Sequence, residues 1–249
     1  MNPGSWLKYA SEKLGKLPDS YLVFDIETTG LDLTIDIPGQ IGWAVVENNK
    51  VVDSGSRTLN WLRGQPPEFH YWISDRIART KNQFEYKKGV ATGKVYGISV
   101  DRLRQGDIPE KVLREFHSLV NECKKNGFKF IAHNGLRLDQ PMLDRILSEI
   151  SEGGMRLKFK PDEYLDTLSI EKSVQLFPEI SDEETWLDFC KRAYRLGGSS
   201  VKGSLDNHCS VKYDLAKKHN LDMNKAHEAD FDCLLTHYLF QEYKELERN

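Results

Sequence analysis

The sequence is poor in cysteine and has no long hydrophobic run. Its four cysteines lie far apart and form no Cys-x-x-Cys pair: Cys123, Cys190, Cys209 and Cys233. This spacing argues against a zinc site or a disulfide framework and predicts free thiols in a reducing compartment. No apolar run approaches the ~20 residues of a membrane span, and the N-terminal segment lacks the apolar core of a signal peptide. We therefore expect an intracellular protein, cytoplasmic or nuclear, that is neither secreted nor bound to a membrane.

The chain also lacks a strong excess of charge of one sign. Its 249 residues include 35 Lys and Arg against 38 Asp and Glu, a formal net charge of −3. This balance neither indicates nor excludes a nucleic-acid partner, because local basic patches can bind phosphates. Hydrophobic residues make up 39% and charged residues 29%, as in folded soluble proteins. The length suits one large domain or at most two small ones, and we predict a single domain over 1–249 with its core in 20–249.

Hydrophobic patterns predict strands that alternate with helices. Apolar and alternating runs predict strands at 21–26, 41–46, 51–58, 128–132 and 164–166, the second and third joined by a hairpin. Three- and four-residue spacing predicts helices at 5–16, 109–125, 140–150, 167–176, 186–196, 205–218 and 229–246. This order favours an α/β fold with helices on both faces of the sheet. Residues 60–100 lack clear periodicity and are interpreted as a long surface loop or insertion.

Two carboxylates stand where the first predicted strand ends. Asp25 and Glu27 are two positions apart, so their side chains point to the same face of a strand. Like charges this close oppose each other's ionisation unless a cation lies between them. The turn Thr28-Thr29-Gly30 follows, and its backbone N–H groups could approach a nucleotide. Taken alone, the pair is explained equally well as strand-end carboxylates that face water.

Two later segments carry further acidic and imidazole groups. Asp139 follows the predicted strand at 128–132, and taken alone it is better explained as the N-cap of the next helix. His227 and Asp232 would differ in direction by about 140° on a regular helix. They can converge only if His227 lies in the loop before the helix and Asp232 lies in its first turns.

Together, the three segments are far more specific than any one of them. D-x-E-T-T-G at 25–30, H-N-G-L-R-L-D at 133–139 and H-x-A-x-x-D at 227–232 resemble the three exonuclease motifs of the DnaQ-like, DEDDh superfamily. The resemblance covers residues 20–245. It implies a ribonuclease H-like fold, with a mixed β-sheet flanked by helices on both faces. It also implies a 3′–5′ exonuclease that releases nucleoside 5′-monophosphates.

The sequence departs from the common motifs in ways that concern the subfamily. The middle motif is one residue longer than the usual H-N-A-x-F-D form, and its spelling is closer to the TREX-type (three-prime repair) exonucleases. Leu138 stands where an aromatic residue is usual, and Gln40 where many members have Glu. These departures remove no expected metal ligand, and the TREX-type spelling favours DNA as the substrate.

The resemblance assigns a role to each site residue. A site for two Mg²⁺ or Mn²⁺ ions would be formed by four carboxylates, those of Asp25, Glu27, Asp139 and Asp232. Asp25 would bridge both ions, Glu27 and Asp232 would bind the ion that carries the attacking water, and Asp139 would bind the other. His227 would take the proton from that water. Carboxylate oxygens suit such hard cations, and four buried carboxylates without counter-ions would be very costly.

The resemblance also implies the substrate contacts. The terminal nucleotide would be seated by Thr28, Thr29, Gly30 and Leu31, with Leu31 packed beside a base. Asn134 would either contact the substrate or tie down its own loop. Bases stack with little sequence preference, so single strands or frayed ends are the expected substrate.

Two segments concentrate positive charge. Residues 74–104 hold eight basic residues against three acidic ones, and residues 187–218 hold seven against three. Either segment could follow the phosphates of a strand, with Lys87 and Lys88 as the test pair in the first. Both are explained equally well as ordinary solvated surface.

Several alternatives stay open at the level of sequence. The chain could be a catalytically inactive nucleic-acid-binding module, although the four carboxylates and the histidine argue against this. It could also be a proofreading or RNA-trimming subunit that needs a partner, or a homodimer. No residue identifies DNA or RNA as the substrate, because that choice depends on contacts to the 2′-hydroxyl.

Overall fold

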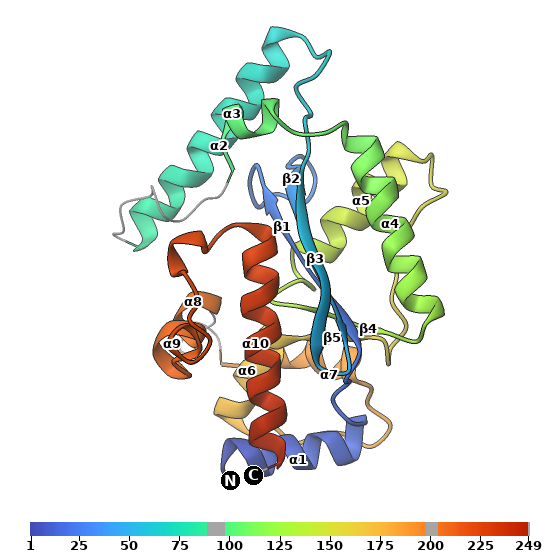
Figure 1. The fold of residues 1–249 in the computed structure, drawn as a ribbon, viewed down its shortest axis with the longest axis vertical. Coiled ribbons are helices and arrows are strands. Elements are labelled where there is room, and N and C mark those ends of the chain that lie inside the picture. Colours follow the sequence, from blue (N-terminus) through green and yellow to red (C-terminus); the bar gives the residue numbers. More distant parts are fainter. Residues whose placement is uncertain (89–97, 198–203, 249) are drawn as a thin grey trace.

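A mixed five-stranded sheet forms the centre of the protein in a computed structural model of the chain (Figure 1). The structure describes residues 1–88, 98–197 and 204–248. The strands are β1 (Tyr21–Thr28), β2 (Pro38–Glu47), β3 (Lys50–Thr58), β4 (Lys129–Ala132) and β5 (Tyr164–Asp166). They lie in the order β3-β2-β1-β4-β5, antiparallel from β3 to β1 and parallel from β1 to β5. The five predicted strands are confirmed.

Helices pack on both faces of the sheet, as predicted. The longer helices are α1 (Pro3–Leu14), α2 (Pro67–Lys88), α4 (Pro109–Lys125), α5 (Asp139–Ile150), α6 (Thr167–Leu176), α7 (Trp186–Ala193) and α10 (Ala229–Arg248). Shorter turns are α3 (Val100–Arg104), α8 (Leu205–Asn207), the π-helix η3 (His208–Lys212), α9 (Leu215–Lys218) and the 3₁₀-helix η4 (Met223–Lys225). Within the described residues, none of the helices is long and apolar enough to cross a membrane.

Two hydrophobic cores lie on opposite faces of β1. Leu22 and Phe24 pack in one core with residues of α4 and α5, and Tyr21 and Val23 pack in the other with residues of α1 and α10. The alternation follows from the two-residue period of a strand. Because both faces of β1 are covered, its inner part is a continuous apolar run. The four cysteines are free, as the sequence predicted, and all four are buried.

The hairpin between β2 and β3 is confirmed and has a local cause. Asn48 and Asn49 adopt φ values of 49° and 66°, which a type I′ turn requires at both central positions. Asparagine tolerates this left-handed conformation better than most residues. The turn pairs Glu47 with Lys50 and so fixes the register of both strands.

The interpretation of 60–100 as a long loop was wrong, because residues 67–88 form helix α2. Its buried side shows helical spacing at Ile73, Ile77 and Thr80, but interspersed charged and aromatic residues hide the pattern. The side chains of Lys87 and Lys88, and all of residues 89–97, lie outside the described part of the structure. In Figure 1, α2 extends away from the sheet at the end where β1 stops.

The single helix predicted at 205–218 was also wrong. The segment forms α8, the π-helix η3 and α9, with Asp214 in a left-handed conformation (φ 53°) just before α9. A left-handed residue cannot continue an α-helix.

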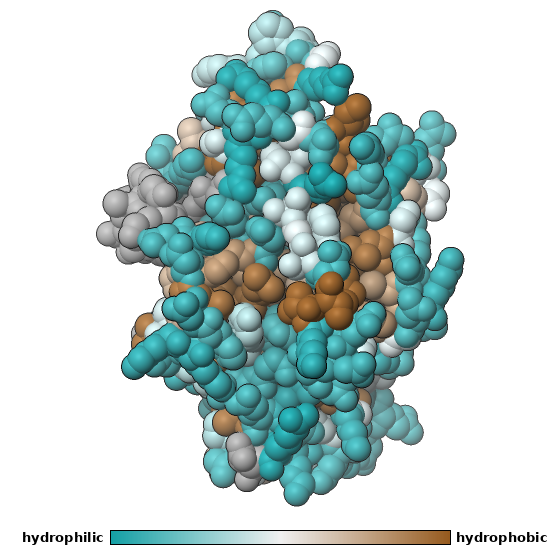
Figure 2. All heavy atoms as spheres, in the orientation of Figure 1, coloured by the Kyte–Doolittle hydropathy of each residue, from teal (hydrophilic) through white to brown (hydrophobic). Residues whose placement is uncertain are grey.

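The surface in the view of Figure 2 is largely hydrophilic, with hydrophobic side chains gathered across its middle.

Candidate active site

Three segments distant in sequence bring the predicted carboxylates together. Asp25 and Glu27 lie near the end of β1, Asp139 is the first residue of α5, and Asp232 lies in the first turn of α10. Asp139 and Asp232 are buried, while Asp25 and Glu27 are partly buried. The central strand and two helix starts therefore position the acidic groups.

Asp139 does not cap α5, so the cap interpretation was wrong. The N-cap is Leu138, and it makes no side-chain capping bond. Instead, the Asp139 Oδ1 accepts the backbone N–H of Ile26 at 3.0 Å. This bond ties the start of α5 to β1 at the residue between Asp25 and Glu27.

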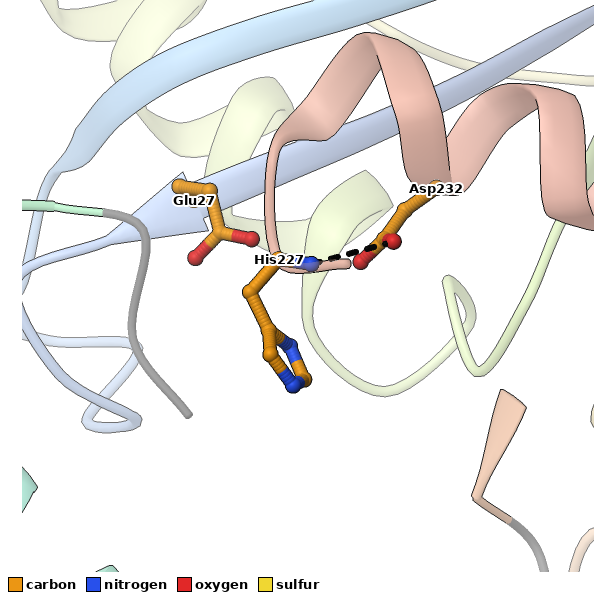
Figure 3. Close-up of side chains that lie close together, drawn as sticks. All are labelled: Glu27, His227 and Asp232. Carbon is orange, nitrogen blue, oxygen red and sulfur yellow. Dashed lines mark hydrogen bonds between the residues drawn. The ribbon is translucent and has the colours of Figure 1, made fainter. Parts of the chain in front are cut away.

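His227 lies in the loop before α10, as convergence with Asp232 requires. Its φ of 70° is left-handed, and its backbone N–H donates to the Asp232 Oδ1 at 3.2 Å. Ligand atoms of Glu27, His227 and Asp232 all lie within 4.8 Å of one another. Figure 3 shows His227 between the two carboxylates, with its imidazole directed away from the helix.

The acidic groups oppose each other's ionisation. Burial, followed by the charge of Asp139, raises the pKa of Asp25 well above its usual range, and Asp232 and Glu27 add to the effect. Burial also raises the pKa of Asp139 to about 7, against the lowering effect of the hydrogen bond from Ile26. Such a cluster can be fully ionised at neutral pH only with positive charge among its members. The donor set, carboxylates with one imidazole, fits divalent cations that prefer oxygen ligands.

Asp166 holds the middle motif in place, a role that the sequence reasoning did not assign. Its buried carboxylate accepts the backbone N–H groups of Asn134 and Leu136, each at 3.2 Å, and caps α6 by accepting from Leu168 at 3.0 Å. It thereby fixes the loop that leads into Asp139. The helix that starts directly after Asp166 is the sequence signal for such a cap.

Two of the predicted substrate residues line one small pocket. Its volume is about 190 Å³, and its lining residues are Leu31, Leu33, Asn134, Arg137 and Leu138. The Leu31 side chain is 53% exposed. The Asn134 Oδ1 is buried and has no hydrogen-bond partner among the described residues. Backbone bonds to Asp166 hold the Asn134 loop, and they leave this side-chain oxygen without a donor among the described residues.

The hydroxyl groups of Thr28 and Thr29 shape their own loop. The Thr28 Oγ1 donates to the Gly30 carbonyl at 2.6 Å, and the Thr29 Oγ1 donates to the Asp36 carboxylate at 3.0 Å. Thr28 and Thr29 are buried. We therefore expect this loop to contact a nucleotide through its backbone and Leu31.

Gln40 connects β2 to the start of α10. Its Oε1 accepts the backbone N–H of Ala229 at 3.2 Å, and its Nε2 donates to the Ser56 Oγ at 3.1 Å. An amide can make both bonds, because it holds an acceptor and a donor. Gln40, which stands where many members of the superfamily have Glu, therefore links β2 to both α10 and β3.

Comparisons with known proteins support the fold. No family model matches the chain, and no curated protein matches it in sequence. Among solved structures, the chain is similar to E. coli exonuclease I bound to a dA16 oligonucleotide, with a TM-score of 0.59 and 15% identity over 93% of this chain and 42% of that chain. The zinc-bound complex of the same enzyme with single-stranded DNA gives 0.56 and 15% identity over 89% and 39%.

The chain thus spans less than half the length of these exonuclease I structures. At this level of identity the likeness concerns the fold, and it agrees with the sheet order and the helices on both faces. The predicted fold class is confirmed: the chain has the ribonuclease H-like fold that exonuclease I also has.

Proposed function

We propose that the chain is a metal-dependent 3′–5′ exonuclease that removes nucleoside 5′-monophosphates from single-stranded or frayed ends. The observation that carries the proposal is the convergence of four carboxylates beside the His227 loop, close enough to raise the pKa of Asp25. The likeness to exonuclease I, which was solved with single-stranded DNA, supports a nucleic-acid substrate. The TREX-type spelling of the middle motif favours DNA over RNA.

The acidic residues are the proposed ligands of two Mg²⁺ or Mn²⁺ ions. The ligands would be Asp25, Glu27, Asp139 and Asp232. When bound, the ions would neutralise these carboxylates, acidify a bound water and offset the charge that develops on the phosphate. The bond from Ile26 to Asp139 and the bond from His227 to Asp232 hold two of the carboxylates in place.

His227 is the proposed general base. Imidazole titrates near neutral pH, which suits proton removal from a water molecule. The bond from its backbone N–H to Asp232 fixes the loop, so the ring stays beside the acidic groups. Its role is then to accept the proton as the water attacks the terminal phosphodiester.

The pocket beside Asp139 is the proposed seat of the terminal nucleoside. Leu31 and Leu138 offer apolar surfaces for the face of a base, and the Asn134 Oδ1, which has no partner among the described residues, would accept a hydrogen bond from the sugar or base. The unpaired Oδ1 beside the pocket supports a substrate role for the Asn134 side chain, while the Asn134 backbone holds its loop through the bond to Asp166.

The direct test uses 5′-labelled single-stranded DNA and RNA of one sequence, with Mg²⁺, Mn²⁺ or EDTA. We expect a ladder that shortens by single nucleotides and requires metal. Asp25→Ala should abolish the ladder, because it removes a ligand. His227→Ala should keep substrate binding and lower the rate by about 10²–10⁴-fold. His117→Ala, on helix α4 and outside the acidic cluster, is the matched control and should retain full activity.

Each other outcome of this test has a definite meaning. Immediate release of a labelled mononucleotide would indicate attack from the 5′ end, and internal fragments would indicate an endonuclease. Binding without degradation would indicate an inactive module, or a subunit that needs a partner. An active Asp25→Ala variant would contradict the assignment of the metal ligands.

A further inference from the structure

The loop between β1 and β2 closes around one buried carboxylate, that of Asp36. This residue is fully buried. Its Oδ1 accepts the Thr29 hydroxyl at 3.0 Å, and its Oδ2 accepts the backbone N–H of Asp32 at 2.9 Å. A Cβ placed on Gly30 would lie 2.3 Å from the same Oδ2. The carboxylate therefore lies directly against the loop proposed to seat the terminal nucleotide.

Helix α2 supplies the charge that balances Asp36. The Arg76 Nε donates to Oδ1 at 2.9 Å, and its Nη2 donates to Oδ2 at 2.5 Å. Thr80, one turn further along α2, donates its hydroxyl to the Thr29 carbonyl at 3.2 Å. The helix is thus fastened to the loop at two points, in addition to its apolar packing.

Helix α5 reaches the same residue from another side. The Arg145 guanidinium donates to the backbone carbonyl of Asp36 and also pairs with Glu149 of its own helix. The first residue of α5 is Asp139. Asp36 therefore joins the nucleotide loop to α2 and to a helix that carries a proposed metal ligand.

The Asp36–Arg76 pair has a strict geometric requirement. The planar guanidinium makes two parallel bonds to the carboxylate, an arrangement that a lysine ammonium cannot reproduce. Loss of one partner would leave the other charge buried without compensation. A change at either residue must therefore move the loop, the helix or both.

The metal ligands on β1 do not depend on this pair. Asp25 and Glu27 are held by the pairing of β1 with β2, opposite Gly42 and Gln40. The loop begins directly after them, and α2 contacts the loop. A change in the pair should therefore displace the seat of the nucleotide while the metal ligands stay in place.

We propose that Asp36 and Arg76 are positioning residues that hold the Thr28–Leu31 loop in register with the acidic site. The proposal rests on the exonuclease function proposed above. It makes α2 part of the substrate machinery, since that helix sets where the terminal nucleotide lies relative to the carboxylates.

The test compares Arg76→Lys with a matched control, Arg156→Lys. Arg156 also makes two bonds to a carboxylate, that of Asp144, at 3.0 and 2.6 Å, and Asp144 likewise accepts a backbone N–H. The measurements are kcat, KM, the dissociation constant of thymidine 5′-monophosphate with Mn²⁺ present, and the affinity for Mn²⁺ alone.

We expect Arg76→Lys to raise KM and the dissociation constant of the mononucleotide together by about tenfold, the equivalent of about one lost hydrogen bond to the nucleotide. Its affinity for Mn²⁺ should stay within about twofold of the wild type, because it is set by groups that α2 does not hold. Arg156→Lys should lower thermal stability and leave all four binding and kinetic constants unchanged.

Two further variants keep the proposal testable if Arg76→Lys folds poorly. Thr80→Val removes only the bond from α2 to the Thr29 carbonyl. It should also raise KM and the dissociation constant of the mononucleotide. Asp36→Asn combined with Arg76→Met removes both charges at once, which avoids an unpaired buried ion, and should still weaken mononucleotide binding.

Unchanged KM and mononucleotide affinity in the folded Arg76 and Thr80 variants would overturn the proposal. A parallel loss of Mn²⁺ affinity would do so too, because the pair would then support the metal site. Failure of the proposed function has a different signature, since the wild type would not shorten any strand. In that case mononucleotide binding still tests the loop, and a wild type that binds none overturns the proposal.

Discussion

The buried titratable side chains of this protein have environments with opposite effects on their pKa values. Burial raises the pKa of Asp25 and Asp139, whose ionised forms are charged. Burial lowers the pKa of His237 to about 4, and the charges of His219 and Lys244 add to this effect. His237 is 4% exposed, and its Nδ1 lies 2.9 Å from the Tyr21 hydroxyl. The folded protein therefore keeps this imidazole neutral.

We predict that His237 makes the fold sensitive to acid. Its pKa falls from 6.5 to about 4 on folding, so below pH 6.5 the unfolded chain binds a proton that the folded chain does not. Its contribution is fully present above pH 6.5 and is lost as the pH falls towards 4. The loss amounts to about 3 kcal/mol as an order of magnitude.

Urea denaturation between pH 4 and pH 8 in EDTA checks this prediction. The difference between the wild type and His237→Gln isolates the histidine, because the site carboxylates titrate in both proteins. The difference should change across this range and level off above pH 6.5. A difference that does not vary with pH would contradict the assigned cause.

At the scale of elements, the contact between β2 and α10 is unusually close. Gly42 lies opposite Asp25 in the sheet, and a Cβ placed on it would come within 2.2 Å of the Ala229 backbone. The first residue of α10 therefore lies directly on the strand. Because His227 precedes this helix and Asp232 lies in its first turn, the contact sets the position of both.

We predict that Gly42→Ala impairs both activity and stability. Overpacking of this kind costs about 1–3 kcal/mol, while a shift of the helix start by about 1 Å would lower turnover by about 100-fold. Gly55→Ala in β3 is the matched control, since its Cβ would meet only the edge of the Trp43 side chain, at 3.1 Å. Equal effects of the two variants on kcat and on thermal unfolding would contradict the prediction.

The helices and strands differ in how clearly their sequences predict them. The strands and α4 follow from simple periodicity and were predicted within a few residues. Helix α2 was not predicted, because charged and aromatic residues interrupt its apolar spacing. The breaks around η3 depend on Asp214, and a single left-handed residue has no reliable sequence signal.

The residues of the candidate site also differ in this way: some belong to short sequence motifs, and others depend on partners that are distant in sequence. The five catalytic candidates could be proposed from the sequence because each belongs to a recognisable short motif. Asp36 was not found, since its partner Arg76 is 40 residues away and neither residue is unusual in its local sequence. The capping interpretation of Asp139 failed for a similar reason, because the bond from Ile26 spans 113 residues.

At the scale of the whole molecule, the acidic site joins β1, α5 and α10, which lie far apart in sequence. A cation bound by these carboxylates would link the middle of the fold to both ends of the chain. Ligands that bind only the folded state raise its stability, by about 2.7 kcal/mol at a concentration 100 times the dissociation constant. In proteins of this size, each kcal/mol corresponds to about 2–4 °C in Tm.

We predict that Mn²⁺ raises the Tm of the wild type by several degrees and that Asp139→Asn abolishes this increase. In EDTA at pH 8, Asp139→Asn should instead be more stable than the wild type, because it removes a buried charge whose pKa is raised to about 7. Its side-chain oxygen can still accept the Ile26 N–H. Asp162→Asn, at an exposed carboxylate, is the control and should behave as the wild type. A Mn²⁺ response retained in Asp139→Asn would contradict the ligand assignment.

Strand β1 has two parts, which differ in the number of neighbouring strands that pair with them. Tyr21–Val23 are paired with both β2 and β4, while Asp25–Thr28 are paired with β2 alone. We expect the backbone amide protons of the inner part to exchange with solvent more slowly than those of the outer part. Asp25 and Glu27 thus lie on the part of β1 where β2 and the bond from Ile26 to Asp139 take the place of two strand neighbours.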